Sequence, residues 1–451
     1  MSNVTFLAIF LMLITAFNCY GQLAIPSQVA RPITPIIEKL PGELTRIRET
    51  VKNPVDTTLA NASSLLDKAS DPLYALPDAI TIKQSNGTAA LKEIKTPDGF
   101  LAIGKEWVLV AKEADIKALS DPDIQVVEKH YLQAIGQWMY TLRITANLEK
   151  LSAIRDSLPT ELQQQLTRNY VYLSQTSNPV DTSRRQVDSA PLLTSSSHSP
   201  SAELAKPDVK TCSLASRVGM IDTPIFESHE AFTHIDVTQK NFLSKPLTNN
   251  TVHGTAVAGI LAQRLASNSL IFNASVFYER SQVSQGATLA NLLEGLNYLA
   301  EQNVDAINMS LSGPENEVLR SALASIDKQG IQVIAAAGNN GPAAPAAYPA
   351  AYLSTIAVTA VDSEHQIYRW ANQGSYIDFS APGVSVETAH PTLRTSRESG
   401  TSMAAPIITA YYACALRHRA HRGDALTSLI EASIDMGKEG RDAVFGYGLL
   451  P

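Results

Sequence analysis

The sequence has few cysteines, which excludes a fold held together by several disulfide bonds. Its 451 residues include three cysteines, at positions 19, 212 and 414. Cys19 lies in an N-terminal segment that we expect to be removed, which leaves two. In an oxidising compartment Cys212 and Cys414 can pair with each other. Two free, buried cysteines that act as small hydrophobic side chains are the alternative.

The sequence also lacks a basic stripe of the kind that nucleic-acid binding requires. Acidic residues outnumber basic ones, 43 to 36, and the net charge of −7 is spread along the chain. We therefore expect no nucleic-acid partner. The densest basic run, 417–422, follows an apolar segment and indicates the solvated C-terminal end of a helix. Hydrophobic residues make up 45% of the chain, which permits a sizeable core.

The hydrophobic run near the N-terminus, Val4–Thr15, has about a dozen residues, too few to span a bilayer comfortably. Such a run is typical of a signal peptide, and the small residues Cys19 and Gly21 fit cleavage after Gly21. No Lys or Arg precedes the run, so the basic part of the signal is weak. We interpret residues 1–21 as a signal peptide, which implies a secreted protein or one of the periplasm or cell envelope. A buried N-terminal helix is the alternative.

The length favours two or three domains. Residues 22–99 are interpreted as a Pro-containing, poorly defined tether. Residues 100–173 show a β-α-β-β-α-β pattern, which predicts a small α+β ferredoxin-like domain. Its strands are expected at 107–111, 124–127, 138–144 and 170–173, and its helices at 114–119 and 148–166. Residues 174–207 are dense in Ser, Thr and Pro and have the composition of a linker.

Residues 208–451 alternate short apolar strands with amphipathic helices. Strands are expected at 218–221, 306–309 and 333–336, with helices at 287–302 and 318–329. Continuous apolar strands separated by helices predict an α/β fold, in which helices cover both faces of a mostly parallel sheet. Functional residues in such sheets lie at the carboxyl ends of the strands.

Three segments of this half carry residues suited to catalysis. Asp222 ends an apolar strand, although a lone Asp there is more often a turn residue. His253 begins the segment His-Gly-Thr-Ala-Val-Ala-Gly, and a lone His is more often structural. Ser402 lies in Gly-Thr-Ser-Met-Ala-Ala-Pro, between a turn and a helix of small residues. A Ser in that position presents its Oγ and its backbone N–H at a helix N-terminus, where an oxyanion is stabilised.

These segments, in the order Asp, His, Ser, resemble those of the subtilisin-like serine proteases (subtilases). The order separates this family from other proteins with the same triad. The resemblance extends from about Val209 to the C-terminus and is supported by four shorter segments. These are Ile-Asn-Met-Ser-Leu-Ser-Gly from 307, Ala-Ala-Ala-Gly-Asn from 335, Tyr-Pro-Ala from 348 and Phe-Ser-Ala-Pro-Gly from 379.

The resemblance implies a role for each catalytic candidate. Ser402 would be the nucleophile, His253 the general base, and Asp222 the group that orients the imidazole. Asn339 would donate its amide to the oxyanion, although a turn residue in Gly-Asn-Asn-Gly is the alternative. The chain is therefore expected to be a secreted serine endopeptidase made as a zymogen. A catalytically silent subtilase-like protein that binds peptides or scaffolds a complex is the alternative, and the complete set of four residues argues against it.

The resemblance also implies a substrate site for an extended polypeptide that pairs through its main chain. Small side chains around it predict an open specificity pocket, and close packing of helix on sheet would explain them equally well. The expected substrate-binding residues are Ser310, Leu311, Ser312, Ala336, Ala337 and Gly338. No cofactor is expected, and no calcium loop is recognisable, so structural calcium stays an open question. Pro224 departs from the Gly or Ser-Gly that usually follows the Asp-Thr pair in this family.

The small domain at 100–173 weakly resembles the propeptides that help subtilases to fold and block their clefts. We therefore expect this N-terminal domain to act as an intramolecular inhibitor of the chain to which it belongs. The competing interpretation is an appended binding domain that stays attached, because the same β-α-β-β-α-β pattern occurs in unrelated modules. Cleavage between the two halves is expected within 174–207, where the chain has few residues to bury.

Overall fold

A computed structural model of the protein describes residues 79–83, 87–146, 152–153, 155–156, 158–174, 212–243, 247–281, 284–419 and 421–451. These residues belong to one compact unit, Leu76–Pro451. The predicted signal peptide, the tether as far as residue 78 and the linker from residue 175 to 207 lie outside the described residues. Within them, no helix has both the length and the apolar character needed to cross a membrane.

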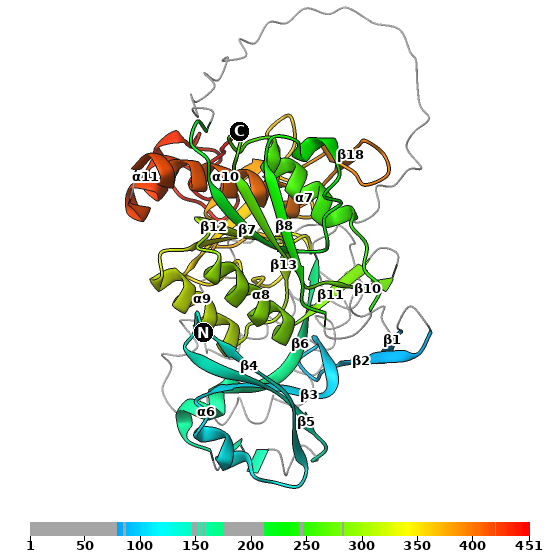
Figure 1. Cartoon of the computed structure of the whole chain (residues 1–451). Coiled ribbons are helices and arrows are strands. Elements are labelled where there is room, and N and C mark those ends of the chain that lie inside the picture. The colour runs from blue at the N-terminus through cyan, green and yellow to red at the C-terminus, as the bar shows by residue number, and fades with distance from the viewer. Residues whose placement is uncertain are drawn as a thin grey trace, which may run out of the picture. The chain divides into compact units, whose positions relative to one another are not determined.

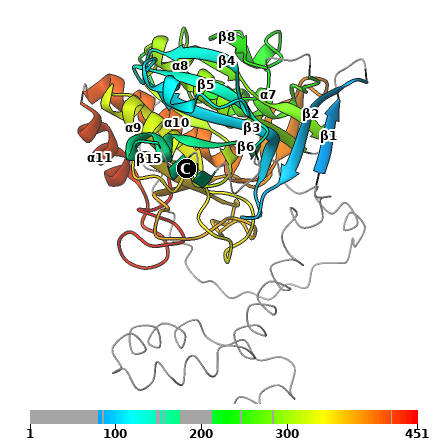
Figure 2. The same cartoon turned by 90° about the horizontal axis from the view of Figure 1, so that it is seen from below.

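The N-terminal part of the described chain forms the predicted ferredoxin-like arrangement. Its strands lie in the antiparallel order β6-β3-β5-β4 (Figure 2). The first and third strands of the unit are therefore central, as the β-α-β-β-α-β pattern requires. The elements are β3 (Leu101–Ala111), the 3₁₀ helix η2 (Asp115–Leu119), β4 (Ile124–Leu132), β5 (Gln137–Ile144), α6 (Thr160–Gln165) and β6 (Leu166–Ser174).

The structure differs from the sequence prediction at both edges of this domain. A hairpin of β1 (Ala79–Lys83) and β2 (Ala89–Lys95) lies in the predicted tether, and β2 pairs with β3. The two strands have only five and seven residues, and the adjacent Lys92 and Glu93 interrupt the alternation in β2, so the pattern is too short to distinguish from a polar tether. At the other edge, Leu166 begins β6 instead of ending a helix, and Ser174 belongs to that strand instead of the linker.

The C-terminal part is built on the predicted parallel sheet. Seven strands pair in parallel in the order β16-β15-β14-β12-β7-β9-β8. All carboxyl ends of these parallel strands lie at one edge, and the order along the chain reverses between β7 and β12, which is where such sheets form a crevice. The strands are β7 (Arg217–Asp222), β8 (Asp236–Asn241), β9 (Leu270–Ser275), β12 (Ala306–Met309), β14 (Gln332–Ala336), β15 (Thr355–Val361) and β16 (Phe379–Pro382).

Alternation within the strands places one hydrophobic core on each face of the parallel sheet. Ile221 and Met309 pack on one face, and Met220 and Ala306 pack on the other. The helices α8 (Leu289–Glu301) and α9 (Glu317–Lys328) cover the first face. The second is covered by α7 (Val252–Ala262), α10 (Thr401–Arg419) and α11 (Arg422–Ala432) (Figure 1). The predicted α/β fold with helices on both faces is therefore confirmed.

The N-terminal sheet packs on the helices α8 and α9. Alternate side chains of β3 face opposite ways, so Leu109 joins a core within the N-terminal domain, whereas Val108 joins the core that contains both helices. Polar contacts reinforce this interface. Asn169 Oδ1 accepts from Ala290 N at 3.1 Å, in the first turn of α8, and Asn297 Oδ1 accepts from Ala134 N at 2.9 Å. The two halves thus share a buried apolar interface with satisfied polar groups.

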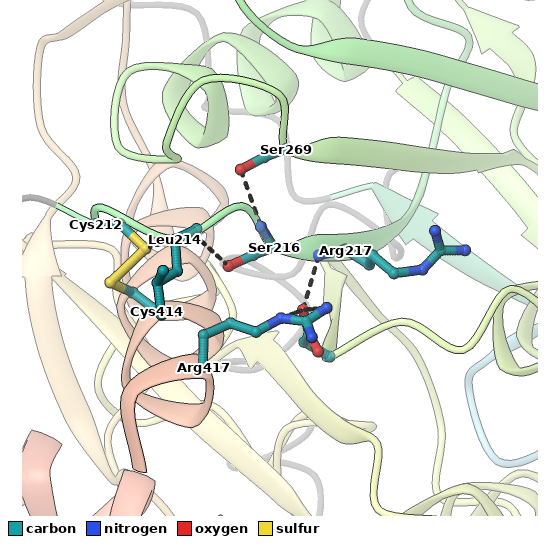
Figure 3. The surroundings of a disulfide bond; sticks show 8 residues. Cys212, Leu214, Ser216, Arg217, Ser269, Cys414 and Arg417 are labelled. Atoms are coloured by element: carbon teal, nitrogen blue, oxygen red, sulfur yellow. Dashed lines mark hydrogen bonds and ion pairs between the residues drawn. A yellow bond between two sulfur atoms is a disulfide. The ribbon is translucent and has the colours of Figure 1, made fainter. Parts of the chain in front are cut away.

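A disulfide joins Cys212 to Cys414 and resolves the open question about these cysteines (Figure 3). Cys212 precedes β7, and Cys414 lies in α10. Arg217 and Arg417 are shown near this bond in Figure 3. Asp305 Oδ2 accepts from Arg217 N at 2.7 Å and pairs with Arg417 of α10. The disulfide therefore links the start of the C-terminal part to α10, whose first turn contains Ser402.

Candidate active site

Asp222 and His253 form a buried pair at the edge of the parallel sheet. Asp222 is the last residue of β7 and is fully buried, and His253 is 6% exposed at the start of α7. His253 Nδ1 lies 2.7 Å from Asp222 Oδ1, so Nδ1–H donates to the carboxylate. Thr223 N donates to the same oxygen at 2.7 Å. Oδ1 therefore accepts two hydrogen bonds, whereas the buried Oδ2 has no partner among the described residues.

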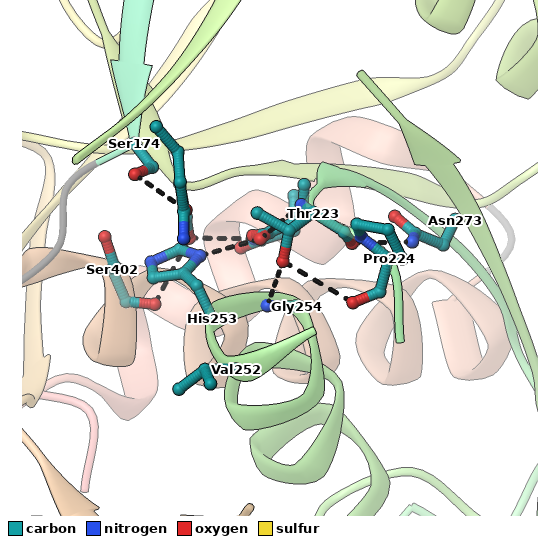
Figure 4. A network of polar contacts seen from close by, with 12 residues as sticks. Ser174, Thr223, Pro224, Val252, His253, Gly254, Asn273 and Ser402 are labelled. Atoms are coloured by element: carbon teal, nitrogen blue, oxygen red, sulfur yellow. Dashed lines mark hydrogen bonds and ion pairs between the residues drawn. The ribbon is translucent and has the colours of Figure 1, made fainter. Parts of the chain in front are cut away.

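The positions of Asp222 and His253 are fixed by a close contact between β7 and α7. Gly254 N donates to Thr223 Oγ1 at 2.8 Å, and a Cβ on Gly254 would overlap the Thr223 carbonyl oxygen. That carbonyl accepts from Asn273 Nδ2 at 2.9 Å (Figure 4). Only glycine lets the helix approach the strand this closely, which explains the Gly after His253 in the motif.

Ser402 is a buried residue in the first turn of α10, and its side chain points toward the His253 imidazole (Figure 4). The helix contains Pro406, which has no N–H to donate to the carbonyl four residues earlier, that of Ser402. Ser310 Oγ donates to this carbonyl instead, at 3.2 Å, and receives a bond from Asn308 Nδ2 at 3.1 Å. Ser310, which directly follows β12, thereby fixes the backbone of Ser402.

Within the described residues, the buried His253 Nε2 has no hydrogen-bond partner. This nitrogen is on the side of the ring away from Asp222 and is the one that must accept a proton from a nucleophile. In structures without substrate, catalytic hydrogen bonds are often long and tighten only when substrate binds. The arrangement therefore fits a general base next to Ser402.

Asn339 is oriented by the residue that precedes Ser402. Its Oδ1 accepts from Thr401 N at 3.0 Å and from Thr401 Oγ1 at 2.9 Å. Because the amide oxygen faces Thr401, the NH₂ end is directed away from it and is able to donate. Gly338, at φ 111°, and Gly400, at φ 137°, give the two loops the backbone conformations that bring these residues together.

Leu311 and Ser312 form a short strand, β13, that pairs with the N-terminal domain. Ser174 of β6 lies opposite Leu311, and Leu173 lies opposite Ser312. On its other side β6 pairs with β11 (Ser284–Thr288), which in turn pairs with β10 (Tyr278–Ser281). An extended segment of the chain therefore occupies the space between β13 and β11, as an added strand would.

The other residues predicted to bind substrate have different contacts. Ser310 is fully buried, and its hydroxyl supports Ser402. Ala336 and Ala337 are also fully buried, and Ala337 O accepts from Tyr376 Oη at 3.0 Å. Gly338 N donates to Thr401 Oγ1 at 3.2 Å. In the described part of the chain, β6 does not pair with these three small residues.

The environment of His253 raises the pKa of its imidazole. Burial alone would lower it, because burial disfavours the charged ring, but the charge of Asp222 and its hydrogen bond to Nδ1 outweigh this. The more distant Glu398 acts in the same direction. The site therefore stabilises an imidazolium, the species that forms when His253 takes a proton.

Comparison with known proteins places these residues in a family. The model described as "Subtilase family" matches residues 164–448, well over half of the chain and including all four catalytic candidates. The chain belongs to the subtilase family.

The chain is 32% identical over 206 residues to the minor extracellular protease Epr of Bacillus subtilis (strain 168), covering 44% of this chain and 32% of Epr. It is 35% identical over 201 residues to subtilisin DY of Bacillus licheniformis, covering 42% of this chain and 72% of that protein. The crystal structure of a lanthipeptide protease aligns with 22% identity and a TM-score of 0.46, over 52% of this chain and 85% of that one. The chain thus spans about a third of Epr and about half of several subtilisins.

Sequence reasoning missed the residues that position the subtilase site. Thr223 holds α7, Thr401 orients Asn339, and Asn308 supports Ser310. All three lie inside or beside the quoted motifs, so their polar side chains at buried positions were the signal that could have found them. In the described ranges, no group of three or more His, Cys, Asp or Glu side chains is close enough to hold a metal ion.

Proposed function

We propose that this subtilase is a secreted serine endopeptidase, and that Ser402, His253, Asp222 and Asn339 catalyse the hydrolysis of peptide bonds. The observation that carries the proposal is the buried 2.7 Å contact between His253 Nδ1 and Asp222 Oδ1, in a ring whose other nitrogen faces Ser402. A catalytically silent binding protein would not need a histidine whose imidazole has a raised pKa.

The mechanism follows from the positions of these side chains. His253 Nε2 takes the proton of Ser402 Oγ as this oxygen attacks the peptide carbonyl, and Asp222 stabilises the imidazolium that results. The carbonyl oxygen becomes an oxyanion, which the Asn339 amide and the Ser402 N–H stabilise. His253 then returns the proton to the leaving amine. Water repeats the sequence on the acyl-enzyme and releases the acid.

We further propose that the N-terminal domain is the intramolecular inhibitor of this enzyme. β6 pairs with β13 and β11 on its two sides, in the position that an extended substrate would take. Tyr172 of β6 is fully buried, and its hydroxyl donates to Pro314 O at 3.2 Å. Gly313 makes room for the Tyr172 ring, because a Cβ there would overlap it. A substrate cannot bind while this strand is in place.

Processing is expected within the first few residues after Ser174, at the beginning of the Ser/Pro-rich stretch. The pairing of Ser174 with Leu311 places the end of β6 beside Ser310, whose hydroxyl donates to the Ser402 carbonyl. N-terminal sequencing of the purified wild-type protein should therefore find a new terminus shortly after residue 174. The fragment released by processing should inhibit the processed enzyme when it is added back.

The Ser402→Ala chain, made without other proteases, is the control for this processing. It should remain intact if the cut is self-inflicted, and cleavage at the same position would show that another protease is responsible. A wild-type terminus close to residue 207 would contradict the placement near Ser174. A released fragment without effect at high micromolar concentration would favour an appended binding domain.

The pH dependence of casein hydrolysis by the processed chain tests the proposed chemistry. Activity requires neutral His253, whose ordinary pKa is about 6.5 and is raised here by Asp222. kcat/KM should therefore fall on acidification through a single group with a midpoint above pH 6.5. Circular dichroism over the same range would verify that the fold persists. Full activity at pH 5.5 with an acid limb near pH 4 would point to carboxylate chemistry and contradict the proposal.

A further inference from the structure

A buried ion pair connects the β1–β2 hairpin to the peptidase domain. Glu93 of β2 is fully buried, and its two carboxylate oxygens accept from Arg280 Nε at 2.9 Å each. Arg280 Nη2 donates to Oε2 at 2.7 Å, and the Tyr278 hydroxyl donates to Oε1 at 2.8 Å. The Arg280 side chain is 3% exposed. Both partners are therefore desolvated, and their separation would leave a buried cation without its anion.

The carboxylate of Glu93 is held by a site that the peptidase domain supplies alone. Tyr278 and Arg280 project from the same side of β10, and Arg280 Nη1 donates to Ser284 Oγ of β11 at 2.9 Å. Burial beside Glu93 raises the pKa of the Tyr278 hydroxyl, which therefore remains a donor. Among the described residues, Glu93 is the one carboxylate that pairs with Arg280. A planar guanidinium that binds both oxygens of a carboxylate is a specific recognition element.

This carboxylate site borders the groove that β6 occupies. Gly286 of β11 lies opposite Leu173 of β6 and opposite Tyr278 of β10. A Cβ on Gly286 would lie 2.7 Å from Arg280 Cδ and 2.8 Å from Val171 Cγ1. Because Gly286 has no side chain, nothing from β11 separates Arg280 from the residue at the Val171 position. A longer acidic side chain at that position of a bound peptide would reach the guanidinium.

We propose that Tyr278, Arg280 and Ser284 form a subsite that binds the carboxylate of an acidic side chain on the N-terminal side of the cleaved bond. In the precursor Glu93 fills this subsite from the N-terminal domain. After processing, an Asp or Glu of the substrate takes its place, at the position that Val171 holds in β6. The inference rests on the proposed peptidase function, because the subsite becomes accessible only when the N-terminal domain is released.

The test compares two peptides that copy residues 166–180 of this chain, one with Val171→Glu and one with Val171→Gln. The processed wild-type enzyme should hydrolyse the Glu peptide with a kcat/KM at least about tenfold higher, since hydrogen-bonded charge pairs contribute on the order of 1.5–3 kcal/mol. In the Arg280→Met enzyme this ratio should fall to about one while hydrolysis of the Gln peptide persists. Arg320→Met, which removes an exposed charge on α9, should keep the wild-type ratio.

A second variant keeps the test decisive if Arg280→Met does not fold. Tyr278→Phe removes one donor to the carboxylate and should lower the Glu-to-Gln ratio several-fold. In the full-length chain, Glu93→Gln removes the charge of the internal occupant and leaves Arg280 buried without its anion, so the time to full activity should shorten by at least about tenfold. An unchanged time would contradict the role of Glu93 as the occupant of this subsite.

The outcomes separate the subsite from the function on which it rests. Equal hydrolysis of the two peptides by an active wild-type enzyme would overturn the subsite alone. An unchanged ratio in Arg280→Met would assign the preference to another residue and would also overturn it. A processed chain that hydrolyses neither peptide nor casein would overturn the peptidase function and the subsite together.

Discussion

Ser402→Ala is expected to lower kcat for peptide hydrolysis by about 10⁶, the size of the effect measured in subtilisin when its nucleophile is removed. The hydroxyl is the atom that forms the acyl-enzyme in the proposed mechanism, which provides no second nucleophile. The fold should survive, because the substitution removes one oxygen from a position followed by Met403, Ala404 and Ala405 in a small-residue helix. Casein hydrolysis and the unfolding midpoint, measured on the same preparation, would check both expectations.

A matched control for Ser402→Ala is Ser396→Ala, on the strand β18 (Thr395–Glu398) that precedes the active-site turn. This variant removes a hydroxyl that bonds to Glu398 and not one that the mechanism uses. It should retain activity close to that of the wild type. Casein cleavage by Ser402→Ala within tenfold of the wild type would show that another group is the nucleophile.

Asp222→Asn is expected to lower kcat by about 10⁴, with the fold retained. The carboxylate accepts a hydrogen bond from His253 Nδ1 and so fixes the proton on that nitrogen, which leaves Nε2 to act as the base. An amide can donate to Nδ1 instead, which favours the wrong tautomer. The substitution also removes the charge that raises the pKa of His253, so the remaining activity should persist to lower pH.

The kcat and the acid limb of Asp222→Asn are therefore measured together. A purely structural role for Asp222 would lower kcat through loss of folded protein and would leave the acid limb where it is in the wild type. A variant that keeps more than a tenth of the wild-type kcat would contradict the orienting role of Asp222.

The candidate catalytic residues could be located in the sequence because the chemistry proposed for them constrains short, local segments. Gly254 is required by the close contact with Thr223, and Pro406 leaves the Ser402 carbonyl free to accept from Ser310. Such requirements restrict which residue types can stand within a few positions of each candidate side chain. The parallel sheet was predictable for a similar reason, because apolar strands covered on both faces read as continuous hydrophobic runs.

The contacts between the two halves could not be predicted, because they join residues far apart in the chain. Glu93 and Arg280 are separated by nearly two hundred positions, and neither lies in a segment with a recognisable motif. The pairing of β6 with β13 depends on how the N-terminal sheet packs on α8 and α9. The disulfide could not be predicted either, because the presence of two cysteines in a sequence does not show whether they lie close together in the fold.

The most direct test of the proposed activity is the reaction of the processed protein with a fluorophosphonate, which modifies an activated serine. We predict that one equivalent of probe is incorporated and that peptide mapping places it on Ser402. We also predict that incorporation falls on acidification with the same midpoint as casein hydrolysis, because both require neutral His253. Folded, processed protein that incorporates no probe, or that carries the probe on another residue, would contradict the assignment of Ser402 as the nucleophile.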